Sequence, residues 1–531
     1  MITNHQNSHS EEILIQEGSV AEKALANKFD FNLWFQGQLQ LAPWWGISLA
    51  FHILLILFLA SIPSVISRVV DEGPTVIEMK APIDKETKKV EEQPDKPVEP
   101  EVSKTDEVEA TSTEDIDAND EFDTESSLKG AGVYDTIGTD GGLGRKRKRG
   151  RIGRQRVAKP EGDAVVAGLI WLAKHQNPDG SWGAKSFQNQ CRDTRCSGIG
   201  DEQYNIGLTG LSMLAFTGAG YTNSSRDTYE DICFGDVVRK GALYLTGIQL
   251  SDGTFGGVRE GKFMYNQALA TYAMADLYAL NMDNPAGVIF REPVERAVKY
   301  ILDTQNPNKG WRYQPKSGQN DTSVSGWVAM ALKAAEGCNI PVPPEAFANI
   351  KSFYDDVTDK NYGKVGYTEL GSLAIRGDED QRLVNANTIQ PSLTAIGIMV
   401  RIFIDKKTTD PLIKLGVSQI LSSLPTWDTS NPCIIDYYYW FYASYCLNQY
   451  DGPNGQSWTA WNEKIKDVLL KHQHIKSDGC ANGSWDPIDR WSSEASRIYC
   501  TATNVLTLEV YYRLDIVKSG PKSDIVKLEA K

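Results

Sequence analysis

The chain is poor in the residues that most often bind metals in proteins. Its 531 residues include only six histidines and eight cysteines, and no two cysteines form a Cys-x-x-Cys pair. The three histidines after residue 160 all adjoin a glutamine: His175, His472 and His474. The absence of these pairs excludes the common zinc-ribbon spacings, and we predict neither a metal site nor a bound cofactor.

The redox state of the cysteines stays open. All eight follow residue 190, and an even number fits an oxidising compartment, in which Cys191 and Cys196 would close a small loop. Cys446 and Cys500, however, lie among aromatic residues in helical patterns, which is typical of buried thiols. The sequence is therefore compatible with one or two disulfides and with free thiols.

Charge is distributed unevenly along the chain. Residues 71–127 have 20 acidic and 6 basic side chains, a balance of −14 that equals the net charge of the whole protein. Such a segment cannot bury a core and should be an extended tether. Residues 145–156 then place eight cations in twelve positions, a pattern typical of nucleic-acid contact. If this part lies outside the cytoplasm, anionic headgroups or the acidic tether are better partners, and a solvated linker is the simplest alternative. We predict no nucleic-acid binding.

One apolar run is long enough to cross a membrane. This run covers residues 46–67, within which residues 47–62 contain no Asp, Glu, Lys or Arg, and Trp44 and Trp45 precede it where aromatic rings favour the interface. No basic stretch precedes the run, so we expect a permanent anchor over residues 43–68. Ser48 and His52 share one face of this helix. An ionisable side chain in a span is usually functional, although a neutral His near the boundary can also simply bond a partner.

A repeated pattern dominates the rest of the chain. Each copy has an apolar, aromatic helix, a Gln at its end, and a Gly-containing turn that delivers an aromatic ring. The clear copies pair Gln176 with Trp182, Gln249 with Phe255, Gln305 with Trp311, and Gln473 with Trp485. Weaker copies over residues 347–367 and 417–427 bring the number to six.

A second kind of helix lies between the copies. These segments are rich in Ala, Leu, Tyr and Thr and carry few charges, as expected of helices buried on both sides. They cover residues 204–218, 265–280, 323–336, 392–404, 434–449 and 495–514. Six outer and six inner helices predict an all-α fold, an α6/α6 toroid that folds as one unit because each repeat needs its neighbours.

The repeats resemble the QW motif of the squalene cyclase and protein prenyltransferase β-subunit superfamily. The first copy matches the motif position by position at Gly168, Trp171, Leu172, Gln176, Gly180 and Trp182. The resemblance implies a toroid in which the Gln and aromatic residues are structural. The chain as a whole is most similar to bacterial prenyltransferase and squalene oxidase repeat proteins, through residues 321–327 and 479–487, which implies a fold but no established reaction.

The amino-terminal part resembles TonB-type energy transducers. Ser48 and His52 in the span, followed by the Pro- and Glu-rich residues 91–100, carry this resemblance. It implies an inner-membrane protein, ExbB/ExbD-like proton-motor subunits as partners, and a tether that crosses the periplasm to a periplasmic toroid. Arg68, just after the span, favours the opposite orientation under the positive-inside rule. We prefer the periplasmic toroid.

The catalytic motifs of the related enzymes are missing or badly placed. The Asp-x-Asp-Asp motif of type II cyclases is absent, and its nearest string, at residues 377–380, lies in a polar loop. Residues 355–359 spell the Asp-Asp-x-x-Asp motif of class I prenyl enzymes, but they follow an outer helix rather than facing a cavity. The prenyltransferase zinc site has no histidine to use on an inner helix.

What remains is the interior of the ring, where inner helices should point aromatic and acidic side chains toward the axis or toward packing neighbours. Asp321 and Asp436 begin inner helices, where an N-cap role suffices, and Asp436 is the acid to test if the protein is an enzyme. The ligand would be a lipid, peptide or glycan. The expected cavity residues are Tyr204, Tyr265, Tyr272, Asp321, Trp327, Tyr437, Trp440, Tyr499 and Tyr511.

The predicted organisation has six parts: a cytoplasmic tail (1–42), a transmembrane helix (43–68), an acidic disordered linker (69–127), a basic Gly/Arg-rich linker (128–160), the toroid (161–515) and a C-terminal tail (516–531). The predicted function is that of a membrane-anchored, extracytoplasmic module that binds a ligand or couples envelope energy. The alternative is a tethered terpenoid or prenyl-lipid cyclase or transferase-like enzyme, and a structural scaffold is a third possibility.

Overall fold

The structure is a computed structural model that describes residues 52–53, 159–374, 390–430, 434–452 and 454–510. Contacts divide the chain into residues 1–115 and 116–531, and the fold described below belongs to the second unit. Among the described residues no helix has the length and apolar character that a membrane span requires. The predicted anchor lies outside these residues, Ser48 included, except for His52 and Ile53.

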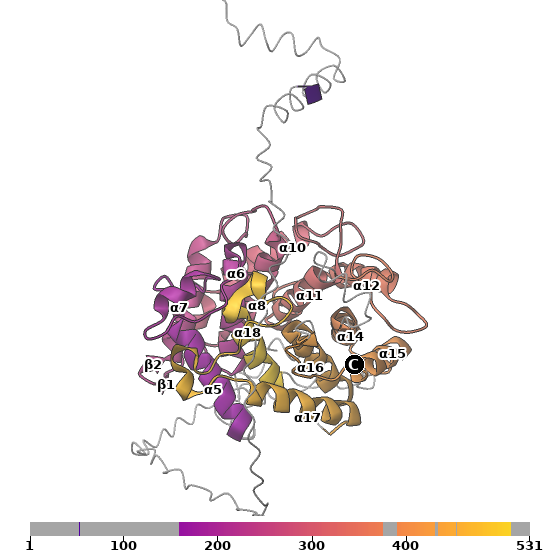
Figure 1. The fold of residues 1–531 in the computed structure, drawn as a ribbon. Coiled ribbons are helices and arrows are strands. Elements are labelled where there is room, and N and C mark those ends of the chain that lie inside the picture. The colour runs from indigo at the N-terminus through magenta and orange to yellow at the C-terminus, as the bar shows by residue number, and fades with distance from the viewer. Residues whose placement is uncertain (1–51, 54–158, 375–389, 431–433, 453, 511–531) are drawn as a thin grey trace, which may run out of the picture. The chain divides into compact units, whose positions relative to one another are not determined.

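Six helices form a closed inner ring (Figure 1). Each packs against the next, and the last, α18, packs against the first, α6. Their bounds are α6 (Asn205–Gly218), α8 (Phe263–Asn281), α11 (Thr322–Gly337), α14 (Ser392–Asp405), α16 (Tyr437–Asp451) and α18 (Ser492–Leu508).

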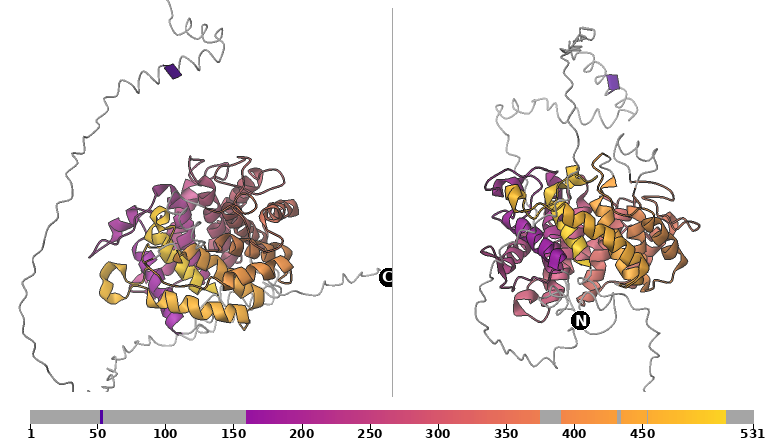
Figure 2. Two further views of the ribbon diagram at one scale, coloured as in Figure 1. Left: turned by 45° about the vertical axis from the view of Figure 1, so that its right-hand side comes forward. Right: turned by 60° about the horizontal axis from the view of Figure 1, so that its bottom comes forward.

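Six further helices surround this ring, one before each inner helix in the chain (Figures 1 and 2). They are α5 (Lys159–Lys174), α7 (Phe234–Ile248), α10 (Arg291–Asp303), α12 (Pro344–Val357), α15 (Pro411–Leu421) and α17 (Gln456–Lys471). The outer layer also closes, since α17 contacts α5, and α5 packs against α18. The described part of the chain is therefore an all-α toroid of paired helices, as the repeats predict.

Short elements occupy the connections. They are η1 (Ser186–Gln190), η2 (Glu202–Tyr204), α9 (Pro285–Val288), η4 (Lys476–Ala481), and the strands β1 (Thr228–Tyr229) and β2 (Ile232–Cys233), which pair antiparallel.

Small residues explain how the inner helices pack so closely. In α8 the buried side chains Ala268, Ala270 and Ala273 present little bulk to the neighbouring helices. On α6, a Cβ added to Gly210 would lie 2.7 Å from the carbonyl oxygen of Leu269 in α8, so only glycine permits this approach. Burial on all sides gives these helices no polar face, which is the pattern the sequence shows.

The glutamines of the four clear copies each join one helical pair to the next. The Nε2 group of Gln176 donates to the carbonyl oxygen of Gly180 in its own turn, at 2.9 Å, and to that of Val237 in α7, at 3.0 Å. Gln249 reaches Pro293 in α10 at 2.8 Å, and Gln305 reaches Ala346 in α12 at 3.1 Å. The carbonyl groups of Val237, Pro293 and Ala346 each belong to the next outer helix, so these three bonds each join two repeats.

The last glutamine closes the ring. Gln473 donates to the carbonyl oxygens of Gly483 and Ala164, both at 2.8 Å, and Ala164 lies in α5, at the other end of the domain's sequence. The aromatic partner in this copy, Trp485, is fully buried and donates from Nε1 to the carbonyl oxygen of Leu469 at 2.9 Å. Trp182 and Trp311 make the equivalent bonds to Leu172 and Ile301.

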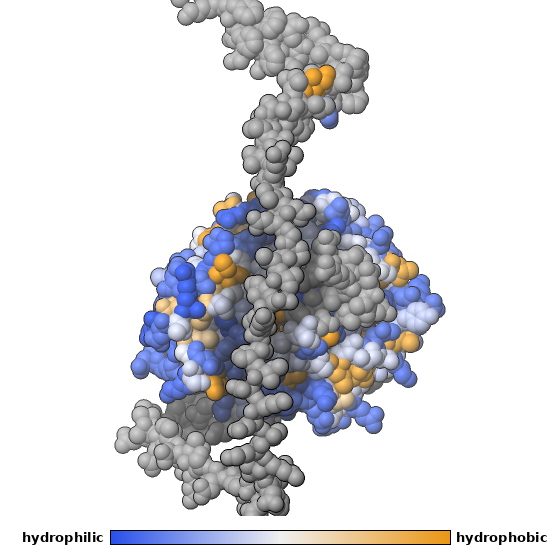
Figure 3. Space-filling view, viewed as in Figure 1, coloured by the Kyte–Doolittle hydropathy of each residue, from blue (hydrophilic) through white to orange (hydrophobic). Residues whose placement is uncertain are grey.

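The outer face of the toroid is mostly hydrophilic in the view of Figure 3, with scattered hydrophobic residues. Most exposed large apolar side chains, such as Leu243 on α7 and Leu415 on α15, are separated from one another in the sequence, and Val288 and Ile289 are the one adjacent pair among the described residues. Isolated apolar residues are normal on a soluble surface, so the interior of the ring is the better place to look for a site.

The ring-closing turn supplies a test of this architecture. Gly483 has a φ of 89°, and an added Cβ would lie 2.2 Å from the carbonyl oxygen of Ala167 in α5. We expect Gly483→Ala to force α5 away from the turn and to lower the free energy of unfolding by about 1–3 kcal/mol more than a matched glycine substitution. The measurement is urea denaturation followed by circular dichroism.

The matched control is Gly318→Ala, because Gly318 also has a positive φ, of 71°, but has no atom within 4 Å of the added Cβ. Both variants carry the strain of a left-handed alanine, so their difference isolates the contact with α5. Equal destabilisation of the two variants would contradict a tightly closed ring.

Candidate functional site

A cavity opens at one end of the inner ring. All six inner helices contribute to its wall from their N-terminal halves, and the space between the lining atoms measures about 1040 Å³ with its open mouth. The wall is mainly aromatic and aliphatic. Its main side chains are Tyr204, Leu208, Leu211, Tyr265, Leu269, Tyr313, Trp327, Tyr367, Leu393, Tyr438, Trp491 and Tyr499.

The predicted cavity residues divide into two groups. Tyr204, Tyr265, Trp327 and Tyr499 line the cavity, as the inner-helix pattern predicts. The prediction is wrong for a second group, whose side chains are buried in the packing between helices and do not line it: Tyr272, Tyr437 and Trp440. Tyr511 lies outside the described residues.

The error on α16 has a simple geometric cause. The hydroxyl of Tyr437 donates to the carbonyl oxygen of Asp486, in the connection between α17 and α18, at 3.0 Å, and the Trp440 ring lies 5.4 Å from the Tyr437 ring between centroids. Tyr438, the next residue, projects about 100° further around the helix axis than Tyr437 and lines the cavity instead. A helix that is apolar on all sides gives no sequence signal for this rotation.

Hydroxyl groups on the cavity wall bond to one another. The Tyr265 hydroxyl donates to Ser323 Oγ at 2.7 Å, and Ser323 Oγ lies 2.6 Å from the hydroxyl of Tyr438. The hydroxyls of Tyr313 and Tyr367 are also 2.6 Å apart. Because these groups already have partners, the wall presents ring faces and aliphatic carbons to a ligand.

One ion pair lies on the wall. Glu494 Oε2 accepts hydrogen bonds from Lys262 Nζ at 2.6 Å and from the Tyr204 hydroxyl at 2.7 Å. The Lys262 and Glu494 side chains are 28% and 31% exposed, so the pair stays in contact with solvent. Burial and the neighbouring Glu494 carboxylate raise the pKa of Tyr204, which keeps its hydroxyl a donor. The sequence analysis missed this pair because its two charges are 232 residues apart.

Asp321 lies just behind the wall rather than on it, which corrects its predicted place. It is fully buried and caps α11, with Oδ1 accepting from the Val324 amide at 2.7 Å. Its Oδ2 is 3.8 Å from Nε of Arg312. Burial raises the pKa of Asp321 to about 7. Hydrogen bonding to the Val324 amide and the charge of Arg312 lower the pKa, but by less than burial raises it.

Asp436 is also fully buried, caps α16, and has a buried neighbour, Asp489, that the sequence analysis missed. Asp436 Oδ1 accepts from the Tyr439 amide at 2.9 Å and from Nε1 of Trp491 at 3.2 Å. Burial raises the pKa of Asp436, and burial together with the Asp436 charge raises that of Asp489 to about 8. Trp491 lines the cavity, so Asp436 lies one side chain behind the wall.

The Asp-Asp-x-x-Asp string over residues 355–359 does not form a diphosphate site in the structure. Asp355 pairs with Arg401 at 2.7 Å, and Asp356 pairs with Lys309. Asp359 accepts from the amides of its own turn, such as that of Asn361 at 2.8 Å. The three carboxylates thus serve three separate contacts. The acidic string at residues 377–380 lies outside the described residues.

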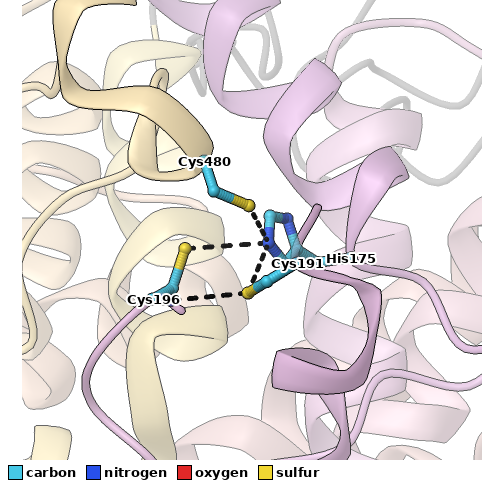
Figure 4. Close-up of side chains that lie close together, drawn as sticks. All are labelled: His175, Cys191, Cys196 and Cys480. Atoms are coloured by element: carbon cyan, nitrogen blue, oxygen red, sulfur yellow. Dashed lines mark hydrogen bonds between the residues drawn. The ribbon is translucent and has the colours of Figure 1, made fainter. Parts of the chain in front are cut away.

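A second cluster of chemically capable groups lies away from the cavity wall. Nε2 of His175 is 3.6 Å from Sγ of Cys191, 3.8 Å from Sγ of Cys196 and 3.4 Å from Sγ of Cys480 (Figure 4). All four ligand atoms lie within 4.8 Å of one another. The prediction of no metal site rested on cysteine spacing in the sequence, and this cluster removes that argument because its members converge from distant segments.

The environment of the cluster holds its histidine neutral. Burial lowers the pKa of His175 to about 4, and burial followed by the neighbouring thiols raises that of Cys196 to about 12. The seven described cysteines are all free, Cys191 and Cys196 included, so no disulfide forms among them. Cys433 lies outside the described residues.

No family model and no curated protein matches the chain. Among solved structures it is similar to an α-1,6-mannanase of Salegentibacter sp. HEL1_6 in complex with α-1,6-mannotriose, with 14% identity and a TM-score of 0.44 over 67% of this chain and 100% of that one. It is also similar to a type II terpene cyclase from Scytonema, with 14% identity and a TM-score of 0.41 over 66% and 97% of the two chains. Similarity this distant transfers neither an activity nor a substrate.

The buried acids make the stability of the domain depend on pH. The pKa of Asp489 is about 8 in the fold against an ordinary 3.8, so the folded protein holds this proton more tightly than the unfolded chain. Its contribution to the free energy of unfolding is fully present below about pH 4 and is lost as the pH rises toward 8, by at most about 1.4 kcal/mol per pH unit. Asp489→Asn should remove this loss, as measured by urea denaturation between pH 4 and pH 8.

The informative quantity is the difference between variant and wild type, because other groups titrate equally in both. This difference should favour Asp489→Asn increasingly as the pH rises. Parallel stability curves would mean that Asp489 is ionised in the folded protein.

Proposed function

We propose that the toroid binds an amphipathic lipid, with the apolar chain in the cavity and the polar headgroup near Lys262 and Glu494. The observation that carries this proposal is the character of the wall, which combines aromatic rings and leucines with hydroxyl groups that already bond to one another. Removing apolar surface from water contributes about 25 cal/mol per Å², so such a wall favours an apolar ligand.

The hydrogen bonding on the wall argues against a glycan as the principal ligand. A sugar needs donors and acceptors that are free to replace its water, and an unmatched polar group costs about 1–3 kcal/mol. The hydroxyls of Tyr265, Tyr438 and Tyr313 are engaged with other protein groups. The Lys262–Glu494 pair is the polar feature that remains near solvent, which suits a headgroup.

The proposal includes the membrane anchor. Residues 46–67 are mainly apolar over a length that can span a bilayer, and the acidic residues 71–127 would form a tether between anchor and toroid. A lipid-binding module held near an inner membrane, with its toroid in the periplasm, is a consistent arrangement. Through Ser48 and His52 the anchor would contact ExbB/ExbD-like proton-motor subunits and couple the module to envelope energy.

A second candidate function is that of a cyclase or transferase-like enzyme on the same class of ligand. It is favoured by the buried acids Asp436 and Asp489: burial raises the pKa of both, that of Asp489 to about 8, so the Asp489 carboxyl keeps its proton at neutral pH. Against it, Trp491 stands between Asp436 and the cavity. A general acid must come within hydrogen-bond reach of the group that it protonates, which here requires that Trp491 move.

The cavity proposal is tested by placing a charge on its wall. Leu269 is partly exposed and lines the cavity. A carboxylate in this apolar wall loses hydration when a chain enters, so Leu269→Glu should weaken binding of geranylgeraniol and of squalene at least tenfold, equivalent to about 1.4 kcal/mol. Binding is measured by quenching of tryptophan fluorescence, since Trp327 and Trp491 line the same space.

The matched control is Leu243→Glu, because Leu243 is 48% exposed on the outer helix α7. It should bind the probes as the wild type does. Equal binding by both variants, or no binding of any probe by the wild type, would overturn the lipid proposal. Analysis of the same incubations for products tests the second candidate: a cyclised product that Asp436→Asn no longer forms would establish an enzyme.

The anchor proposal is tested in cells by crosslinking. A photoreactive amino acid at position 48, on the face of His52, should capture a small membrane protein of the proton-motor class. The same probe at position 54, about 200° around a helix from His52, is the control and should capture mainly lipid. Equal capture from both faces, or none from position 48, would remove the motor partner from the proposal.

A further inference from the structure

We propose that His175, Cys191, Cys196 and Cys480 bind one zinc ion, and that this ion fastens the last repeat of the toroid to the first. The proposal is independent of the cavity and its ligand. It rests on the geometry of the four ligand atoms, on the groups that orient them, and on their place in the ring.

The geometry is that of a tetrahedral Cys₃His site. With Zn–S bonds of about 2.3 Å and a Zn–N bond of about 2.0–2.1 Å, a tetrahedron has N···S edges of about 3.6 Å. The three N···S distances of the cluster are 3.4, 3.6 and 3.8 Å. Figure 4 shows the three sulfur atoms turned toward the same imidazole nitrogen from separate segments.

The histidine is oriented as zinc ligands are. Its Nδ1–H donates to the carbonyl oxygen of Trp171 at 2.8 Å, which leaves the lone pair on Nε2 directed at the sulfur atoms. The imidazole also stacks on the Trp171 ring, with centroids 4.1 Å apart, so its plane is fixed. This hydrogen bond and the stacking select one tautomer and one ring position before any metal arrives.

A backbone amide approaches one of the sulfur atoms. The Cys196 amide donates to Sγ of Cys191 at 3.4 Å. Amides directed at sulfur stabilise thiolate ligands. Zinc binding would release three thiol protons and leave the site with a net charge of −1.

Two other readings of the cluster fit the structure less well. A Cys191–Cys196 disulfide would not explain why Cys480 and the oriented histidine lie beside these two residues, and both cysteines are free. A catalytic zinc keeps an open coordination position, whereas this site supplies four protein ligands. None of the four lines the cavity, so the role is structural.

The position of the cluster explains what the ion would hold together. His175 directly follows α5, and Cys191 and Cys196 lie in the connection from α5 to α6. Cys480 lies in η4, in the connection between α17 and α18. The ligands from the two ends of the toroid are 305 residues apart in sequence. One ion would therefore bridge the first repeat and the last.

Other polar contacts converge on the same junction. Arg497 in α18 donates to Oγ of Ser197 at 2.8 Å, and the Arg497 amide donates to the carbonyl oxygen of Gly198 at 2.9 Å. The Asp201 amide reaches the carbonyl oxygen of Glu494 at 2.7 Å. These backbone groups are free to bond because α18 is interrupted at Ser496, with a φ of 72°. The junction is thus built for a fixed register between the two repeats.

The experiment uses the full chain in detergent, purified without added chelator. We expect one zinc per chain by elemental analysis, and cobalt(II) exchanged into the protein should give the ligand-field and thiolate charge-transfer bands of a tetrahedral site. Cys480→Ser should lower the metal content at least tenfold. Cys233→Ser, which changes a partly exposed cysteine outside the cluster, is the matched control and should retain the ion.

A thermal scan separates metal binding from folding. A strong chelator should lower the melting temperature of the wild type and of Cys233→Ser, because the ion binds the folded state, but should leave Cys480→Ser unchanged. If Cys480→Ser does not fold, the cobalt spectrum of the wild type still decides. A wild type with no zinc and an octahedral cobalt spectrum, or with two thiols fewer than its cysteine content after denaturation, would overturn the proposal.

Discussion

The closed ring depends on one repeated contact, made at four of its six repeat boundaries, in which the side-chain amide of a glutamine after an outer helix bonds to the backbone of the next outer helix. The two hydrogens of each Gln Nε2 are divided between the carbonyl of its own turn and a carbonyl across the repeat boundary, as in Gln176 with Gly180 and Val237. A buried amide that lost either partner would carry the cost of desolvation. The contact therefore fixes both the turn and the position of the neighbouring pair, which hydrophobic packing alone leaves free to slide.

The final copy of this contact, at Gln473, must join the last repeat to the first without help from a covalent connection between them. A helix in the middle of the chain is joined to its neighbours by covalent connections, but α5 and α17 contact each other only through space. Gln473 with Ala164, Arg497 with Ser197, and the four residues of the proposed zinc site all occur at this junction. Loop-closure entropy explains the concentration, because joining segments this far apart in the chain costs more than joining adjacent ones.

The sequence predicted the helices much better than the directions of their side chains. The predicted inner helix over residues 265–280 is Phe263–Asn281 in the structure, because a long stretch of Ala, Leu and Tyr, with Asp276 as its one charged residue, has few other structures to adopt. On α16 the same scarcity of charge hides the rotation of the helix, and so Tyr437 was expected in the cavity where Tyr438 lies. The last inner helix was predicted to begin at residue 495, but α18 begins at Ser492 and is interrupted at Ser496. The first turn of α18, which the prediction left out, places Glu494 on the cavity wall.

The metal-ligand cluster could not be read from spacing for a related reason. Spacing rules detect ligands that come in pairs from one turn, whereas Cys480 reaches His175 only after the ring has closed. A usable signal was nevertheless present: His175 and Cys480 occupy the helix end and the turn of the first and last repeats, and a closed ring makes those two repeats neighbours. The six-fold repeat thus carried more information about sites than any local motif in this chain.

The contacts that close the ring and the mouth of the cavity lie at the same end of the toroid. Because each outer helix ends where the next inner helix begins, the glutamine turns and the cavity mouth share one face. The connection that carries Cys191 and Cys196 continues to Tyr204, and the connection that carries Cys480 continues to Trp491 and Glu494. The Tyr204 hydroxyl and the Glu494 carboxylate, 290 residues apart, are 2.7 Å from each other on the cavity wall. Whatever fastens the first repeat to the last therefore also sets the geometry of the polar pair beside the ligand, so a loosened junction would widen the cavity before it unfolded the domain.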